Sequence, residues 1–304
     1  MKILIATEKP FAADAVCKMR KMAEEAGHEV ILLEKYSSKE EIIEAVVDAD
    51  AMIIRSDKAT AEVIGAAKNL KIIVRAGAGY DNIDLPSCNE KKIVAMNTPG
   101  QNSNAVAELA LGLMIYTSRN LFTPGKGCEL QGKTLGIEGF GHIGQLLAQK
   151  GRALGMNVII FAAEPGDKHR GWETVPTLEE LYQKSNYISV NIPAKPETKG
   201  LIGYDLISKM PKGGILVNTA RKEVIDEDGL EQALAEREDI KYITDIAPVK
   251  YDELKEKFGK QIFATPKKQG AETGEANMNA GLAAMSQIIG YFADGCTKFQ
   301  VNKW

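Results

Sequence analysis

Thr134-Leu135-Gly136-Ile137-Glu138 runs directly into Gly139-Phe140-Gly141-His142-Ile143-Gly144, which joins a short apolar strand pattern to a G-x-G-x-x-G turn. In such a turn the first glycine permits a tight bend, the second lets the backbone approach a pyrophosphate, and the third lets a helix pack closely on the strand. The following helix presents free N–H groups and its positive dipole end to the phosphates. The segment therefore predicts a dinucleotide-binding site, and a tight turn that only packs is the alternative interpretation.

Two features near this turn bear on the cofactor. Glu138 places a carboxylate directly before the glycines, where it would repel a pyrophosphate unless its side chain points away. The acidic residue that binds the adenosine ribose is expected at the end of the next strand, but that position is Ala162, with Glu164 and Asp167 slightly beyond. The cations at 168–170 would suit a 2′-phosphate. The sequence therefore predicts NAD and leaves NADP open.

Strand patterns alternate with helical patterns along almost the whole chain. The expected strands are Lys2–Thr7, Glu29–Leu33, Ala51–Arg55, Lys71–Arg75, Ile93–Asn97, Thr134–Glu138, Asn157–Phe161, Tyr187–Ile192, Gly214–Asn218, Tyr242–Asp245 and Ile262–Ala264. The expected long helices are Pro10–Ala26, Asn104–Ser118 and Thr273–Ala293. This alternation is typical of parallel sheets with helices on both faces. We therefore expect an α/β fold with two doubly wound parallel sheets and a boundary near Thr98-Pro99-Gly100.

Composition excludes several classes of protein. The 304 residues suit two domains, and 44% hydrophobic with 26% charged residues is a globular mixture. A net charge of -3 provides no basic field for nucleic acid. The most apolar stretch, Ala105–Tyr116, is too short to span a bilayer, and the amino terminus shows no signal-peptide pattern. The four scattered cysteines carry no metal signature and suit a reducing cytoplasm.

Several further segments carry a resemblance to a known family. Arg75-Ala76-Gly77-Ala78-Gly79-Tyr80-Asp81-Asn82-Ile83-Asp84 resembles the substrate-loop signature of D-2-hydroxyacid dehydrogenases, and the arginine before Ala-Gly is similar to the phosphoglycerate-specific branch. Asn97-Thr98-Pro99 through Asn102 to Ala107-Glu108-Leu109, the glycine turn, and Asn218-Thr219-Ala220-Arg221 follow in the family's order. The resemblance covers nearly the whole chain, which looks like a short form without regulatory domains.

The resemblance implies an architecture and an activity. A Rossmann cofactor domain of residues 100–276 is inserted in a flavodoxin-like substrate-binding domain of residues 1–99 and 277–304. The implied activity is an oxidoreductase reaction that transfers a hydride between the C2 hydroxyl of 3-phosphoglycerate and a nicotinamide, with a role in serine biosynthesis. The implied assembly is a homodimer. The tail Phe299-Gln300-Val301-Asn302 is expected to return to the first domain.

The resemblance also implies site residues, each at a position that matches a family motif. Arg221 matches the arginine that grips the substrate carboxylate and keto oxygen, and Asp245 matches the aspartate that binds the nicotinamide carboxamide. The remaining cofactor positions are Gly139, Gly141, His142, Ile143, Gly144, Ile192, Thr219, Ala220 and Ala78. The substrate positions are Arg55, Arg75, Gly77 and Asn102. Arginines at strand ends suit a ligand with a carboxylate and a phosphate, and ordinary surface ion pairs are the alternative for Arg55 and Arg75.

The sequence departs from the family at the acid/base pair. Where the family has a histidine after Thr-Pro, Thr265-Pro266 is followed by Lys267-Lys268, and the position of the partner glutamate is Lys250. A lysine acts as a base at neutral pH only when its pKa falls, and burial or a neighbouring cation such as Arg221 lowers it. A glutamate would oppose that change, so the two departures are consistent with each other. The hypothesis is that Lys268 is the acid/base, assisted by Lys267; the alternative is that these lysines only hold phosphate or a helix end.

Two other functions stay open at this point. One is a dehydrogenase of another D-2-hydroxy acid such as glyoxylate, hydroxypyruvate or lactate. The other is a catalytically inactive NAD(P)-sensing protein, which the missing histidine and glutamate suggest. Arg221 and Asp245 argue against the sensor, because a sensor has less need of a substrate clamp.

Overall fold

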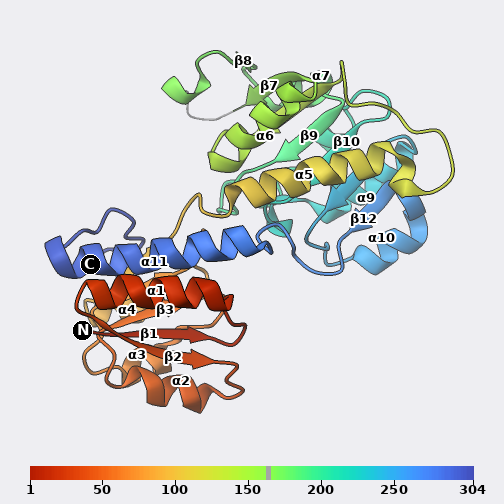
Figure 1. Ribbon diagram of the computed structural model, residues 1–304. Helices are drawn as coiled ribbons and strands as arrows, with labels where there is room; N and C mark the ends of the chain where they lie inside the picture. The colour runs from red at the N-terminus through yellow and green to blue at the C-terminus, as the bar shows by residue number, and fades with distance from the viewer. Residues whose placement is uncertain (162–165) are drawn as a thin grey trace. The chain divides into compact units, whose positions relative to one another are not determined.

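The computed structural model describes residues 1–161 and 166–304, and the chain divides into two compact units. Unit 1 comprises Met1–Asn102 and Glu272–Trp304, and unit 2 comprises Ser103–Ala271. Each unit is a parallel sheet with helices on both faces (Figure 1). The predicted α/β fold with two parallel sheets is therefore confirmed. The sequence predicts that the chain passes between the two domains after residue 99 and again before residue 277.

Unit 1, within the described residues, holds a five-stranded sheet in the flavodoxin-like order β2-β1-β3-β4-β5. Its strands are β1 (Lys2–Thr7), β2 (Glu29–Glu34), β3 (Ala51–Ile54), β4 (Ile72–Arg75) and β5 (Val94–Asn97). Its helices are α1 (Ala13–Glu25), α2 (Lys39–Val46), α3 (Ala61–Ala66), α4 (Leu85–Glu90) and α11 (Gly274–Asp294). Alternate residues of β1 face opposite sides of the sheet. Ile3 and Ile5 pack with α1 and α11, whereas Leu4 and Ala6 pack with α2 and α3 (Figure 1).

The carboxyl-terminal tail returns to unit 1, as predicted. The backbone N–H of Val301 donates to the Ala95 carbonyl at 2.8 Å. The Asn302 side chain accepts from the Ala95 N–H at 2.8 Å and donates to the Ile93 carbonyl at 2.9 Å. Because these bonds reach β5 and the residue before it, the tail covers the edge strand of the sheet.

Unit 2, within the described residues, holds a seven-stranded sheet in the Rossmann order β12-β11-β10-β9-β6-β7-β8. Its strands are β6 (Thr134–Glu138), β7 (Asn157–Phe161), β8 (Glu173–Thr174), β9 (Tyr187–Val190), β10 (Ile215–Asn218), β11 (Lys241–Thr244) and β12 (Ile262–Ala264). Its α-helices are α5 (Ser103–Ser118), α6 (His142–Ala153), α7 (Leu178–Lys184), α8 (Tyr204–Ile207), α9 (Glu227–Glu236) and α10 (Tyr251–Phe258). Short 3₁₀ turns cover Asn120–Phe122, Asp167–His169, Lys222–Val224 and Gly259–Gln261. The strand order reverses between β6 and β9, which is where such sheets bind ligands.

The two faces of the unit 2 sheet carry different helices. Leu135 and Ile137 of β6 lie in the core with α5 and α6, which run side by side in Figure 1. Ile188 and Val190 of β9 lie in the core with α7, α8 and α9. Strand β8 was not predicted, because its two residues are exposed and carry no apolar pattern. Among the described residues, none of the helices has the length and apolar composition needed to cross a bilayer.

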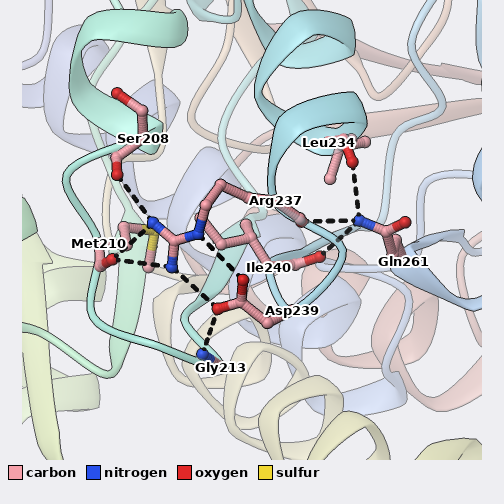
Figure 2. A network of polar contacts seen from close by, with 8 residues as sticks. All are labelled: Ser208, Met210, Gly213, Leu234, Arg237, Asp239, Ile240 and Gln261. Carbon is pink, nitrogen blue, oxygen red and sulfur yellow. Dashed lines mark hydrogen bonds and ion pairs between the residues drawn. The ribbon is translucent and has the colours of Figure 1, made fainter.

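A polar network joins three connections of unit 2 (Figure 2). The Arg237 guanidinium donates to both carboxylate oxygens of Asp239, at 2.9 and 2.8 Å, and also to the Ser208 carbonyl at 2.9 Å. The Gly213 N–H donates to the same carboxylate at 2.7 Å. The hydrogen bonds from Arg237, the largest cause, hold the pKa of Asp239 well below its usual value. The Gln261 amide donates to the Arg237 carbonyl at 3.0 Å and so extends the network to β12.

We expect Asp239→Asn to lower the free energy of unfolding at pH 7 by about 1–3 kcal/mol, because it breaks charge-assisted bonds in a partly buried site. The pKa of Asp239 is lower in the folded than in the unfolded chain, so its stabilisation is present above pH ~4 and is lost as the pH falls below that value. Urea unfolding from pH 7 toward pH ~3 should therefore show the wild-type advantage shrinking. The exposed neighbour Glu238, changed to Gln, is the control. Equal urea midpoints for Asp239→Asn and Glu238→Gln at pH 7 would contradict this account.

Candidate active site

The glycine turn leaves the carboxyl end of β6 and opens α6. Gly139 has a φ of +86°, and a Cβ added there would lie 2.9 Å from the Asn191 carbonyl oxygen. A Cβ at Gly144 would lie 2.3 Å from the Gly139 carbonyl oxygen, so glycine lets α6 pack on the turn. A Cβ at Gly141 would meet no atom of the described chain within 4 Å. Gly141 is the N-cap of α6 and has no side chain to cap it, so the first-turn N–H groups face the open space beside it.

Other predicted cofactor residues lie around this turn. His142 is the exposed first residue of α6, and the half-buried Ile143 packs against the core below. A methyl group of Ile192 lies 3.0 Å from the position of a Cβ on Gly139, which places Ile192 beside the turn. Unit 2 therefore brings together Gly139, Gly141, His142, Ile143, Gly144 and Ile192.

Glu138 is directed away from α6. Leu135 and Ile137 face the core that contains α6, so Glu138 lies on the opposite face of the sheet. There the Tyr182 hydroxyl of α7 donates to Glu138 Oε2 at 2.8 Å, and the Glu138 residue is 1% exposed. Burial raises the pKa of Glu138 to about 7. The repulsion expected from the sequence is thus reduced both by the direction of the side chain and by a carboxyl group that holds its proton near neutral pH.

The ends of β10 and β12 bring two cations to one carbonyl oxygen. Arg221 Nη1 donates to the Ala220 carbonyl at 3.0 Å, and Lys268 Nζ donates to the same oxygen at 3.1 Å. Asn218 fixes this loop, because its side-chain amide donates to the Arg221 carbonyl at 2.9 Å and accepts from the Ala220 N–H at 2.9 Å. Arg221 and Lys268, predicted separately from the sequence, are therefore neighbours.

Asp245 lies fully buried directly after β11. Its Oδ2 accepts from the backbone N–H groups of Gly270 at 2.8 Å and Gln269 at 3.3 Å. Burial raises the pKa of Asp245, whereas the Gly270 bond and the charges of Lys268 and Arg221 lower it. Its Oδ1 is buried and has no hydrogen-bond partner among the described residues. This oxygen is available to accept a bond from a ligand.

Thr219 is also buried, and its hydroxyl has no partner within the described part of the chain. The structure thus places two unsatisfied polar groups, the Asp245 carboxylate and the Thr219 hydroxyl, in loops that follow neighbouring strands of one sheet. Buried polar groups normally have hydrogen-bond partners, so an unsatisfied pair at the carboxyl ends of two neighbouring strands indicates a ligand site.

Among the described residues, no cluster of His, Cys, Asp and Glu is arranged to hold a metal ion.

The two other lysines at the acid/base positions have different contacts from Lys268. Lys267 is exposed, and its backbone carbonyl accepts from the Thr265 hydroxyl at 2.7 Å. Lys250 forms ion pairs with Asp228 and Glu231 of α9, and the Asp228 hydrogen bond raises the pKa of Lys250. Lys250 therefore holds α9 to the loop after β11. Lys268 is itself exposed, so burial does not act on its amine. The neighbouring Arg221 disfavours the ammonium form, whereas the Asp245 charge, which also interacts with Lys268, favours it.

Unit 1 carries the predicted substrate arginines. Arg55 follows β3, and its guanidinium donates to the carbonyls of Lys9 and Pro10 at 3.0 and 3.1 Å and to Asn277 Oδ1 at 2.5 Å. Arg75 ends β4, and its Nε donates to the Arg55 carbonyl at 3.0 Å. A Cβ at Gly77 would lie 1.4 Å from Arg75 Nη1, so the guanidinium lies directly against Gly77. Arg55, Arg75 and Gly77 are therefore brought together at the carboxyl end of the unit 1 sheet.

The remaining predicted residues are placed as follows. Ala78 is exposed, and its carbonyl accepts from the Asn97 amide at 2.6 Å. Asn102 ends the first segment of unit 1, directly before α5. The roles predicted for both stay predictions. Ala162 and Glu164, on which the choice between NAD and NADP depended, lie outside the described residues.

Comparison with known proteins gives a consistent result. The family model described as D-isomer specific 2-hydroxyacid dehydrogenase, NAD binding domain, matches residues 117–266. A hydroxypyruvate reductase of Thermotoga maritima is 36% identical over 86% of this chain and 90% of its own length. The chain belongs to the D-isomer-specific 2-hydroxyacid dehydrogenase family. The resemblance inferred from the sequence is therefore confirmed.

Two further members of the dehydrogenase family are informative. The crystal structure of an NAD⁺-bound 3-phosphoglycerate dehydrogenase of Entamoeba histolytica is 51% identical, has a TM-score of 0.90, and covers 100% of this chain and 99% of its own. The D-3-phosphoglycerate dehydrogenase of Methanocaldococcus jannaschii is 36% identical over 95% of this chain. This chain spans 57% of the length of that relative.

Sequence reasoning missed two parts of this candidate site. The Gly270 N–H that holds Asp245 was not predicted, because a backbone donor leaves no residue-type signal. The Tyr182 partner of Glu138 was also missed, although a tyrosine among the apolar positions of a predicted helix is a signal that a buried hydroxyl needs a partner.

Proposed function

We propose that the protein is a D-3-phosphoglycerate dehydrogenase that interconverts 3-phosphoglycerate and phosphohydroxypyruvate. The observation that carries the proposal is the pair Arg55 and Arg75, joined through the Arg55 carbonyl at the carboxyl ends of β3 and β4. Guanidinium groups bind phosphate and carboxylate through paired hydrogen bonds. The similarity to the Entamoeba histolytica enzyme supports the same substrate.

The proposed cofactor is NAD, which suits the residues at hand. The open space at Gly141 and the N–H groups of α6 fit a pyrophosphate, and Asp245 Oδ1 with the Thr219 hydroxyl fits a carboxamide. When bound, the nicotinamide supplies the acceptor and donor of the hydride at C2. Unit 2 would then be the dinucleotide-binding domain and unit 1 the substrate-binding domain.

The chain's own residues would accept the C2 hydroxyl proton and bind the negative charge of the substrate carboxylate. In the oxidation direction the C2 hydroxyl proton passes to Lys268 Nζ, and in reduction it returns to the same oxygen. Arg221, beside Lys268, holds the substrate carboxylate and the oxygen on C2. A role in serine biosynthesis, a cytoplasmic location and a homodimer remain predictions that accompany this assignment.

An initial-rate matrix tests the proposal. Phosphohydroxypyruvate, hydroxypyruvate and glyoxylate are each measured with NADH and with NADPH. We expect kcat/KM to be highest for phosphohydroxypyruvate with NADH, because Arg55 and Arg75 would bind its phosphate. Hydroxypyruvate lacks only that group and therefore isolates its contribution. A preference for an unphosphorylated acid would support a dehydrogenase of another D-2-hydroxy acid. Dinucleotide binding without turnover would support the sensor.

Two glycine substitutions separate cofactor binding from folding. Gly141→Ala adds a Cβ into open space, so we expect a stability change below about 1 kcal/mol with NAD binding weakened about tenfold or more. Gly144→Ala places its Cβ against the Gly139 carbonyl and should lower the unfolding free energy by about 1–3 kcal/mol. Thermal unfolding and NAD titration of both variants measure these effects. Unchanged NAD affinity in Gly141→Ala would show that the pyrophosphate does not approach this residue.

A further inference from the structure

Glu138 is a buried carboxyl group that the reaction described above does not use. It is the last residue of β6, and its main chain continues directly into Gly139 of the turn. Oε2 accepts from the Tyr182 hydroxyl at 2.8 Å, whereas Oε1 is buried without a hydrogen-bond partner among the described residues. A carboxylate that is buried and half satisfied is costly, so this site favours the protonated form.

The surroundings of Glu138 contain aromatic and apolar groups. The neighbouring side chains are Phe161 of β7, Val190 of β9 and Tyr182 of α7. The charged side chains of α7 lie on its outer side, where Lys184 pairs with Glu180 at 2.5 Å. Burial, opposed by the Tyr182 bond, brings the pKa of Glu138 to about 7, and no charged group of the described chain contributes to that shift. Glu138 therefore changes its protonation state near neutral pH.

We propose that Glu138 takes up a proton when a dinucleotide binds at the glycine turn, and so sets how cofactor affinity depends on pH. The inference rests on the proposed use of NAD. The pyrophosphate would bind at the turn that begins one residue after Glu138, and although the carboxyl group points to the opposite face of the sheet from α6, the buried surroundings screen a like charge only weakly, which favours the protonated form. By linkage, NAD binds more tightly to the protein in which Glu138 is already protonated. Affinity should therefore fall as the pH rises through neutrality.

The test measures NAD dissociation constants of the purified chain from pH 6 to pH 8.5 by calorimetry. For the wild type we expect the constant to rise about three- to tenfold over this range, since each unit of pKa change on binding is a tenfold change in affinity. Glu138→Gln keeps an acceptor for Tyr182 and cannot ionise, so its constant should stay at the low-pH value throughout. Glu179→Gln, an exposed change on α7, should behave like the wild type. Titrations in two buffers of different ionisation enthalpy should show proton uptake in the wild type and none in Glu138→Gln.

His142 is the competing explanation, because it is an exposed ionisable residue at the start of α6, beside the glycine turn. A pH dependence that persists in Glu138→Gln and disappears in His142→Gln would overturn the proposal. Equal wild-type affinity at pH 6 and pH 8.5 would overturn it alone, whereas no NAD binding at any pH would overturn the proposed function as well. If Glu138→Gln fails to fold, Tyr182→Phe replaces it. Loss of the Tyr182 donor raises the pKa of Glu138 and should move the midpoint to higher pH.

Discussion

Replacing Arg221 with lysine is expected to lower kcat/KM for phosphohydroxypyruvate about a thousandfold, which corresponds to ~4 kcal/mol of transition-state stabilisation. The guanidinium offers two parallel donors to the substrate carboxylate and the oxygen on C2, and an ammonium group offers a point charge without that geometry. The loop itself should keep its shape, because Asn218 bonds the backbone of residues 220 and 221 and not the Arg221 side chain. The loss therefore reports on the substrate clamp.

The controls for Arg221→Lys separate chemistry from cofactor binding and from folding. NAD affinity should change less than about threefold, since the glycine turn and Asp245 carry the proposed cofactor contacts. Arg119→Lys, an exposed change after α5 in the same unit, should leave kcat/KM unaltered. A wild-type kcat/KM in Arg221→Lys would remove Arg221 from the site.

Strand–helix alternation and the glycine spacing were enough to predict both sheets, because they depend on patterns that are local in sequence. β1, β6, β7 and β12 begin and end at the predicted residues, since turn residues border their apolar runs. β9 ends at Val190, two residues before the predicted end, because Ile192 continues the apolar alternation of Ile188 and Val190 into the loop beside Gly139. The alternation of apolar residues indicates which residues are buried, and this loop is partly buried although it does not belong to the sheet.

Side-chain direction was less predictable than position. The motifs placed Arg221, Asp245 and Lys268 near the carboxyl edge of one sheet, and the structure joins them through the Ala220 carbonyl and through charge. Lys250 occupies a motif position as well, yet its ammonium group is directed to the carboxylates of α9. Spacing along the chain identifies which loop carries a residue. Which neighbour that residue contacts depends on charges supplied by other elements.

Replacing Lys268 with alanine is expected to lower kcat by about 10²–10⁴, the usual contribution of a general acid/base. Its ammonium group lies on the Ala220 carbonyl beside Arg221, so the lysine enters the site next to the proposed substrate clamp. Lys267→Ala is the matched control, since it removes the same group from the adjacent exposed residue. We expect Lys267→Ala to retain most of the activity. Equal losses in both variants would show that the two lysines act only as a pair of charges.

Lys268→Arg distinguishes proton transfer from anion binding. An arginine keeps the positive charge and the reach to the Ala220 carbonyl, but its guanidinium does not release a proton at neutral pH. If Lys268 is the acid/base, Lys268→Arg should be as slow as Lys268→Ala, and kcat/KM should lose the rise with pH that deprotonation of Lys268 produces in the oxidation direction. If Lys268 only binds the phosphate or carboxylate, Lys268→Arg should restore most of the rate. Because Lys268 is exposed in the chain alone, the acid/base role further requires that bound ligand exclude water from its amine. The pKa taken from the pH–rate profile should then lie well below the ordinary lysine value of about 10.4.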